Sequence, residues 1–265
     1  MITWRLGVAR AGVELKNFYR QWDAMVFTLS FPVVLLIILG TIFRGTYEGS
    51  DVTSAQYFVP GMLAAGLAST TFLNLGGGIA TDRDDGTLRR LRGVPMPPAA
   101  YFVGKALMAL AVTAAEVVLV CATGVLLFDL RLPATPGRWF TLGWVLVLGC
   151  AACALLGVAA SGLAGSARSA PVVLSLMYLV LGFCSGVYFT PVNALPEPLL
   201  QAGALFPLRW MAQGFRSAFL PDTILSQEVV YSWEHGKTAL ILAGWTLGGL
   251  LLARRTFRWR GRRDG

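Results

Sequence analysis

The densest group of charged side chains lies in a short segment between two long apolar stretches. Residues 82–92 hold three aspartates and four arginines. The acids come first and most arginines later, an order that favours a helix because the helix dipole attracts anions at its N-terminal end and cations at its C-terminal end. On such a helix Leu88, Leu91 and Val94 would project together. The segment is therefore predicted to dock into a groove of a soluble partner. A solvated basic loop is the alternative, but it would need neither the acids nor the leucines.

Few other side chains could carry chemistry. Glu116 is the only formal charge in the apolar stretch 106–128, and a carboxylate inside a membrane is costly and faces an interior or a partner. It is predicted either to serve a substrate path or coupling, or to make structural hydrogen bonds. His235 is the only histidine, too few for a cluster of histidine ligands. The sequence also lacks the Gly-x-x-x-x-Gly-Lys-Ser/Thr loop that cradles nucleotide phosphates. No catalytic, cofactor-binding or metal-binding residue is predicted, so the chain is expected not to be an enzyme.

The elements that must position these residues are apolar enough to cross a membrane. Hydrophobic residues make up 55% of the chain and charged residues 14%, against roughly 25% charged in a typical soluble domain. A run of about 20 uncharged residues crosses a hydrocarbon core of ~30 Å as a helix. The chain is therefore predicted to be an all-α membrane protein. Its six predicted transmembrane helices lie at residues 24–43, 57–80, 106–128, 139–164, 171–190 and 238–253.

The basic residues favour one orientation of these spans. If the N-terminus is cytoplasmic, 16 of the 22 lysines and arginines fall on the cytoplasmic side, which is a strong positive-inside bias. Both termini and the segment 82–92 are then expected in the cytoplasm. The net charge of +8 needs no nucleic acid to explain it. The basic cytoplasmic tail, residues 254–265, is predicted to contact anionic lipid headgroups.

Two further segments are predicted to lie at the membrane surface. Within residues 1–23, the apolar residues that recur at helical spacing are Val8, Ala11, Leu15, Phe18, Tyr19 and Trp22, and most of the remaining surface is taken by Arg10, Glu14, Lys16, Asn17 and Arg20. This pattern predicts an amphipathic helix in the cytoplasmic interface; a solvated tail is the alternative. Residues 192–236 are too apolar for a solvated loop and too broken by proline for a span, so two short helices are expected there, re-entrant or interfacial on the outer side. Small residues at every fourth position from Gly149 to Gly165 predict close packing of the fourth span, within the chain or at a subunit or translocation interface.

The stretch 82–105 resembles the cytoplasmic segment of ABC-2 type transporter permeases. That segment typically reads acid-Arg-acid-x-Gly-Thr-Leu-x-x-Leu, then a proline, then Gly-Lys opening the third span. The matching residues are Asp82, Arg83, Asp84, Gly86, Thr87, Leu88, Leu91, Pro95, Gly104 and Lys105. The chain departs from the pattern by using Asp where Glu is usual, and Val94 where Thr or Ser commonly precedes the proline. Residues 206–216 and the six-span pattern are similar too, so the resemblance covers nearly all of residues 1–265 as one transmembrane domain.

The resemblance implies a membrane subunit that dimerises, as a homodimer or with a paralogue. It would dock a separate ATP-binding subunit through the N-terminal helix and the coupling segment, residues 81–97. The residues implied to transmit force there, none of them catalytic, are Asp82, Arg83, Asp84, Gly86, Thr87, Leu88 and Leu91. ATP and Mg²⁺ would be bound by the partner, so this chain would hold no cofactor.

The resemblance also implies transport, here across a bacterial inner membrane. Outward movement of a drug-like or lipophilic substrate is expected, because the chain is compact and carries no added soluble domain. Export of a lipid-linked or cell-envelope glycan by the same mechanism is the alternative. A membrane-embedded enzyme is a further alternative, but it would need several ionisable side chains at one membrane depth, and Glu116 stands alone.

Overall fold

The computed structural model describes residues 2–93, 97–162 and 166–256. Within these residues the protein is all-helical, with no β-strand and one isolated β-bridge between Thr46 and Thr53. Five helices are long and apolar enough to cross a membrane: Trp22–Ile42, Ser54–Asp84, Ala99–Phe128, Pro136–Ser161 and His235–Arg255. The predicted all-α membrane fold class is confirmed to that extent. Val94 and most of the basic tail lie outside the described residues.

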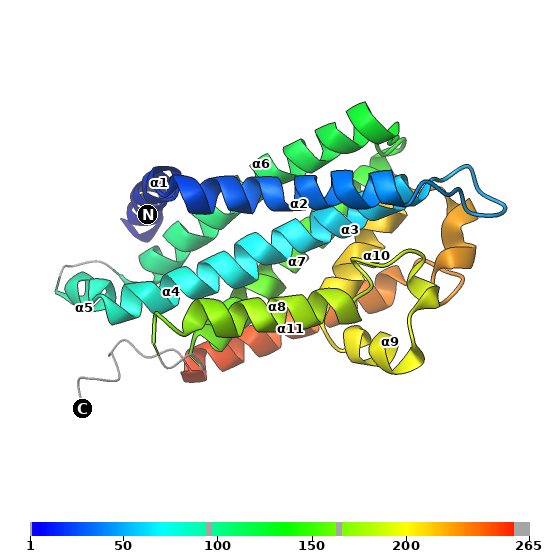
Figure 1. The fold of residues 1–265 in the computed structure, drawn as a ribbon. Helices are drawn as coiled ribbons and strands as arrows, with labels where there is room; N and C mark the ends of the chain where they lie inside the picture. The colour runs from blue at the N-terminus through cyan, green and yellow to red at the C-terminus, as the bar shows by residue number, and fades with distance from the viewer. Residues whose placement is uncertain (1, 94–96, 163–165, 257–265) are drawn as a thin grey trace.

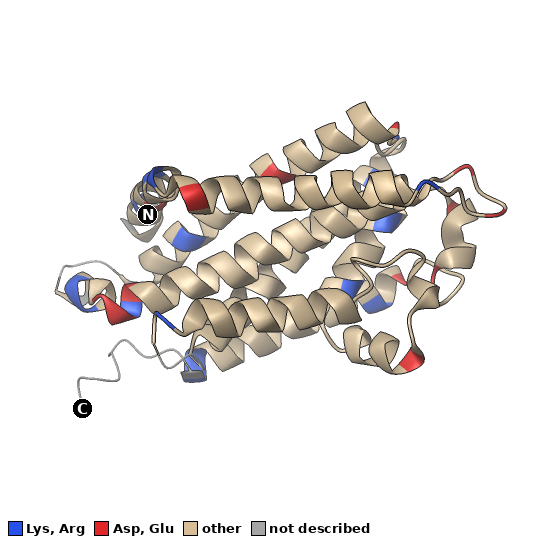
Figure 2. Ribbon diagram, viewed as in Figure 1, with Lys and Arg blue, Asp and Glu red and all other residues tan. Residues whose placement is uncertain are grey.

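Most of the helices lie side by side in one bundle, and other helices lie at its two ends (Figure 1). A central element, described below, is surrounded by α2 (Trp22–Ile42), α6 (Pro98–Phe128), α7 (Pro136–Ser161), α8 (Ala170–Cys184) and α11 (His235–Thr256). One end carries α1 (Ile2–Arg20) and α5 (Thr87–Arg92); the other carries α9 (Glu197–Ala204) and the connecting loops. Figure 2 shows charged residues gathered at the two ends, with long uncharged stretches between them. This is the distribution that a hydrocarbon core imposes.

The centre of the bundle is one long element interrupted by a π-helical turn. It consists of α3 (Ser54–Ala68), the turn Ser69–Asn74 and α4 (Leu75–Asp84), and nearly every residue of α3 is buried. A capping box starts it: the Thr53 hydroxyl accepts from the Gln56 amide at 3.2 Å, and the Gln56 side chain accepts from the Thr53 amide at 3.0 Å. The predicted span 57–80 lies wholly inside this element.

The small-residue stripe on the fourth span packs within the chain. A Cβ added to Gly76 of α4 would come within 2.8 Å of the carbonyl oxygen of Gly157 in α7. The two backbones therefore touch, which small residues permit. Gly149, two turns earlier on α7, faces Met211. Gly165 lies outside the described residues. The described part of the stripe therefore packs against neighbouring helices of its own chain.

The fifth predicted span forms a shorter helix than expected. Residues 171–190 were expected to be helical, but α8 ends at Cys184 and contains 15 residues, about 22 Å at the helical rise. The chain turns at Gly186, which has a φ of 70°. The next residues pack against the outer part of the bundle: Val187 is buried against Gly61, and Tyr188 donates to the Tyr178 hydroxyl at 3.2 Å. Whether α8 crosses the membrane as a sixth span stays a prediction.

The segment before the last span forms two short helices, as expected from its prolines. They are α9 (Glu197–Ala204) and α10 (Pro207–Phe219). Almost every residue of α10 is buried, and the helix packs against α3, α7 and α11. A re-entrant position in the membrane remains a prediction for this pair.

The N-terminal helix buries a different face from the expected one. Ala11, Leu15 and Phe18 of the predicted apolar face are at least partly buried, but Val8 and Tyr19 are exposed. Against α6 the helix also buries Glu14, which had been expected on the polar face. The physical reason is that this carboxylate pairs with a lysine of α6, so the buried face includes an ion pair.

Candidate functional site

The charged segment folds as the end of α4, a sharp turn and the short helix α5. Gly86 has a φ of 77°, a left-handed conformation that favours glycine because it lacks a Cβ. Asp85 stabilises the start of α5 by accepting from the Thr87 amide at 3.0 Å, and the Thr87 hydroxyl accepts from Arg90 at 3.1 Å. The motif's Gly and Thr therefore build the turn that sets α5 off from the central helix. The acids precede α5, so one continuous helix over residues 82–91 is not observed.

Leu88 points into the protein and not outward. Its side chain is 1% exposed and packs with apolar residues of α4, α6, α7 and α11, among them Ile79, Tyr101 and Val158. Leu91 is half-buried against the same cluster. The expected knob of leucines for a partner's groove is therefore corrected: Leu88 anchors α5 onto its own bundle, because the turn at Gly86 folds the helix back over the apolar ends of the spans.

A buried ion network joins three elements just behind this turn. Lys105 of α6, 5% exposed, places its Nζ 2.8 Å from Asp82 of α4 and 2.8 Å from Glu14 of α1. The Tyr101 hydroxyl donates to Asp82 at 2.8 Å. Arg10 pairs with the other oxygen of Glu14 at 2.5 Å. Two cations and two carboxylates balance, which makes it tolerable to bury Glu14 and Lys105 and to half-bury Arg10 and Asp82.

The packing of α1 on α6 explains the glycine beside this lysine. A Cβ added to Gly104 would come within 2.6 Å of the Arg10 side chain. Arg10 and Lys105 also lie 5.8 and 5.7 Å from the centre of the Tyr101 ring, within range of a cation–π attraction. In the Gly-Lys pair of the motif, the glycine therefore allows α1 to approach α6 closely, and the lysine holds α1 there through its ion pair.

The other two predicted residues of this region hold the loop after α7. Arg83 donates to the carbonyl oxygen of Ser161, the last residue of α7, at 3.2 Å. Asp84 accepts from the backbone amide of Ala167. Together with Asp82, these side chains are used within the chain to fix the end of α4 against its neighbours.

The exposed surface of the turn and α5 is polar. Asp84, Asp85, Arg89 and Arg90 are exposed around the turn and α5. This patch mixes both signs of charge and stands at the tip of the structure in Figure 2. Sequence reasoning did not find that Arg10, Glu14 and Tyr101 lie together with Lys105 and Asp82 of the predicted segment. The available signal was Lys105, a charge opening a long apolar helix that demands a buried counter-ion.

Glu116 lies inside the bundle on α6, about three helical turns beyond Lys105. It is 2% exposed, and its Oε2 accepts from the Thr70 hydroxyl at 3.0 Å. Its Oε1 and the Thr113 hydroxyl, one turn away on α6, are buried without a hydrogen-bond partner among the described residues. Thr70 belongs to the π-helical turn, a feature often found at functional positions.

The opposite end of the bundle holds a second buried ion pair. Arg216 of α10 donates to the two oxygens of Glu228 at 2.5 and 3.2 Å, and the residues are 1% and 3% exposed. Burial opposes the charged form of Arg216, but Glu228, Tyr57 and Tyr47 together outweigh it and raise the pKa of Arg216. Tyr57 donates to Glu228 at 3.1 Å, with its ring 5.1 Å from the guanidinium carbon. The pair holds the loop after α10 against α3.

Within the described residues, no group of three or more His, Cys, Asp or Glu side chains could hold a metal ion. At the α1–α5 end, ion pairs connect α1, α4 and α6. A family model described as "ABC-2 type transporter" matches residues 11–220, which include all of α5 and, apart from Arg10, the ion network around Lys105. No curated protein matches the chain.

Proposed function

Because the chain belongs to the ABC-2 type transporter family, whose membrane domains are non-catalytic permease subunits served by a separate ATP-binding subunit, we propose that it is the membrane half of an exporter. The observation that carries the proposal is α5, set off from the central helix by Gly86 and tied to α1 and α6 behind it. The chain itself binds no ATP. Family membership also excludes the alternative of a membrane-embedded enzyme.

The ATP-binding subunit docks on the exposed surface of this turn. Its contacts are the polar side chains of Asp84, Asp85, Arg89 and Arg90, which are exposed around α5. Gly86 and Thr87 shape the surface, and Leu88 and Leu91 hold it on the bundle. Asp82 and Arg83 act one layer deeper, by fixing α4.

Movement of α5 passes to the spans through the network. When ATP binding shifts the docked subunit, α5 and the end of α4 move together, since Leu88 packs against Ile79 of α4. Because Asp82 is paired with Lys105 of α6, and Lys105 is paired with Glu14 of α1, a movement of α4 displaces α6 and α1 as well. The α1 helix thus follows the central helix, and two subunits rock against each other.

The permease works as a dimer, most simply a homodimer, in the inner membrane of a bacterium. Its α1–α5 end faces the cytoplasm, an orientation supported by the excess of basic residues on that side. The exposed aromatic residues Trp4, Tyr19 and Trp22 of the N-terminal region suit contact with the headgroup layer.

The substrate is drug-like or lipophilic and is moved outward. Glu116 is the one charged residue in the middle of a long span, so the membrane-spanning helices offer almost only apolar contacts. A lipid-linked or envelope glycan would need more hydroxyl-binding groups. Glu116 serves coupling, through the Thr70 hydrogen bond to the π-helical turn of the central helix.

The test is ATP hydrolysis by the permease co-purified with its ATP-binding subunit in lipid. A panel of lipophilic drugs is compared with a panel of envelope lipids and lipid-linked glycans. Stimulation by drugs supports the proposal, and stimulation by lipid-linked glycans alone selects the alternative. If a correctly folded permease forms no complex with the ATP-binding subunit, the docking role of α5 is wrong.

The role of Glu116 is tested with Glu116→Gln, which keeps the size of the side chain and an acceptor for Thr70. Substrate-stimulated hydrolysis should fall severalfold while the complex still forms. Unchanged stimulation would assign Glu116 a structural role only. Thr123→Val, on the exposed side of the same helix, serves as the control.

A further inference from the structure

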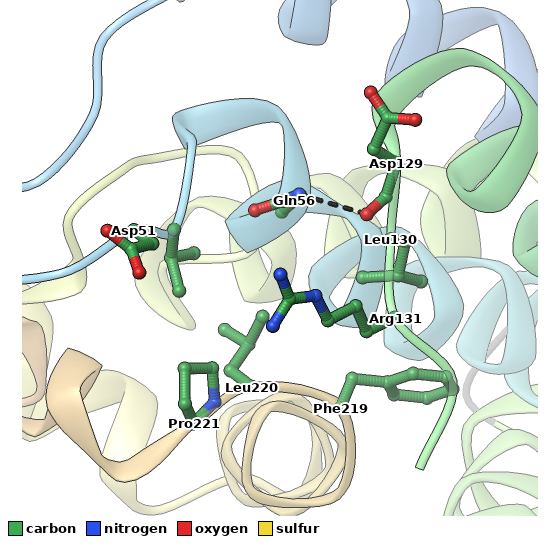
Figure 3. A pocket seen from close by; sticks show the side chains of 9 residues that line it. Asp51, Gln56, Asp129, Leu130, Arg131, Phe219, Leu220 and Pro221 are labelled. Carbon is green, nitrogen blue, oxygen red and sulfur yellow. Dashed lines mark hydrogen bonds between the residues drawn. The ribbon is translucent and has the colours of Figure 1, made fainter. Parts of the chain in front are cut away.

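A small cavity opens at the end of the bundle opposite α5. It has a volume of about 190 Å³ and lies between the start of α3, the turn after α6 and the end of α10. Its lining residues are Asp51, Val52, Gln56, Asp129, Leu130, Arg131, Phe219, Leu220 and Pro221. Figure 3 shows the Arg131 side chain reaching into the middle of this ring, while the Asp129 carboxylate points away from it and Asp51 lies at the far rim. Of the three charged lining residues, Arg131 is therefore the one whose side chain reaches into the ring, and it stays exposed to solvent there.

The backbone around the cavity is held firmly. Asp129 has a positive φ of 53°, and the Leu130 amide donates to Gly124 at 3.0 Å, so the chain turns back sharply after α6. The side-chain amide of Gln56 donates to the carbonyl oxygens of Phe128 and Asp129, each at 3.1 Å. These bonds tie the turn that carries Arg131 to the first turn of α3.

Arg131 differs from the other basic residues at this end. Arg44 and Arg209 donate to backbone carbonyl oxygens of Thr41 and Leu200. Arg138, Arg216 and Lys237 pair with Asp222, Glu228 and Glu234. Among the residues that the structure describes, Arg131 alone of these six has neither a hydrogen bond nor an ion pair. A guanidinium offers five N–H donors in a fork that fits a phosphate or carboxylate, so its donors are available to a ligand.

Most of the other lining residues are apolar. Val52, Leu130, Phe219 and Leu220 are each 2–4% exposed, and they give the cavity hydrocarbon walls beside the guanidinium. The cavity also lies at the ends of two candidate spans, where α6 finishes at Phe128 and α3 begins at Ser54. Lipid headgroups lie at that depth of a bilayer, and basic pockets between spans recognise them.

We propose that this cavity binds the phosphate of an anionic amphiphile, with Arg131 as the bidentate donor and the walls against the carbon atoms next to the phosphate. The outer-leaflet location rests on the orientation given under the proposed function; the binding chemistry does not. Two sources share this chemistry: a bilayer phospholipid, whose binding would be regulatory, and an exported amphiphile leaving the transporter.

The experiment measures binding to the purified full chain in neutral detergent, without the ATP-binding subunit. Three probes are compared: dihexanoyl phosphatidylglycerol, dihexanoyl phosphatidylcholine and inorganic phosphate. Affinity is read from the ligand-dependent rise in Tm. Wild-type protein should prefer phosphatidylglycerol, and Arg131→Gln should weaken that binding at least tenfold. Arg131→Lys should give an intermediate affinity, because it keeps the charge and loses the fork.

The matched control is Arg44→Gln, since Arg44 lies in the loop before α3 and donates to its own helix end. It should bind phosphatidylglycerol as the wild type does. Equal affinities for wild type and Arg131→Gln would overturn the proposal. Equal binding of phosphatidylcholine would overturn the anionic preference, and equal binding of inorganic phosphate would assign the site to free phosphate. None of these results depends on ATP coupling, so a failure here is distinct from a failure of the proposed function.

The two sources are then separated in lipid with the complete transporter. If the ligand is a regulatory phospholipid, phosphatidylglycerol in the bilayer should change ATP hydrolysis in wild type and not in Arg131→Gln, with no loss of the lipid from the donor leaflet. If it is an exported amphiphile, a fluorescent phosphatidylglycerol should move to the outer leaflet in wild type and several times more slowly in Arg131→Gln. An effect of neither kind would overturn a functional role for the site.

Discussion

The two ends of the bundle both bury charge, but they do so with different connectivity. Arg216 and Glu228 are 12 residues apart and sit together on α10 and the loop that follows it. Lys105 joins Asp82 to Glu14, which is 91 residues away from it in the sequence. The first arrangement fixes one loop against the outer part of the bundle. The second fixes three helices relative to one another and leaves Asp82 partly exposed. The comparison predicts that the outer pair serves stability, while the network at the α5 end serves communication between elements.

The largest effect on stability is expected from Arg216→Met. It leaves the Glu228 carboxylate buried without a cation, and breaking such a pair from one side costs about 3–5 kcal/mol. Thermal unfolding of the purified permease in detergent measures the loss. Adding Glu228→Gln to the same protein should recover part of it, because the uncompensated charge is gone. If Arg216→Met were as stable as wild type, the outer pair would not be a stability element.

Lys105→Met should cost less stability and more function. Arg10 still pairs with Glu14, and Asp82 keeps the Tyr101 hydroxyl and some exposure, so a loss of about 1–3 kcal/mol is expected. Substrate stimulation of ATP hydrolysis in the complex should nearly disappear. Lys16→Met, on the exposed side of α1, should change neither property. A variant that stays fully coupled would break the comparison, since the network would then be structural only.

Gly86→Ala tests the turn that carries α5. A side chain at this left-handed position lowers the free energy of unfolding by about 1 kcal/mol. The strain lies in the turn that orients α5, the proposed docking surface. A modest drop in Tm and a weaker complex with the ATP-binding subunit are expected. Gly93→Ala is the control, because Gly93 has a φ of −79° at the other end of α5. Equal behaviour of the two variants would show that the turn has no special conformational demand.

The smallest effect on stability is expected from reversing charges on the exposed surface. Arg89→Glu combined with Arg90→Glu should leave the Tm unchanged, since both side chains are exposed. Affinity for the ATP-binding subunit should fall at least tenfold, measured by binding of the two purified components. Reversing Arg254 and Arg255 of α11, at the same end of the bundle, controls for net charge. If both double variants weakened binding equally, docking would depend on overall charge and not on α5.

Much of this protein could be predicted from local pattern. Long uncharged runs can only be stable in a membrane as helices, because every backbone polar group must be satisfied inside the segment. Five spans were therefore predicted close to their observed positions, and the prolines at 196 and 207 correctly indicated two short helices. The segment 82–92 was predicted to couple to a partner because its charges, between two apolar runs, stand out in the sequence alone. The glycine that builds its turn was in the recognised pattern.

Only the tertiary structure decided what those residues face. Leu88 is buried because α5 folds back over the ends of α4, α6 and α7, and no periodicity in six residues encodes that direction. Glu14 is buried because it is a counter-ion of Lys105, which lies far along the chain. Arg216 is buried because Glu228, in the loop that follows α10, pairs with it. The helix α8 ends early because residues 187 and 188 find partners in the bundle. The hydropathy of a segment indicates whether it can lie in an apolar or a polar environment. Which residues form that environment depends on contacts between segments that are far apart in the sequence, and the sequence alone does not show those contacts.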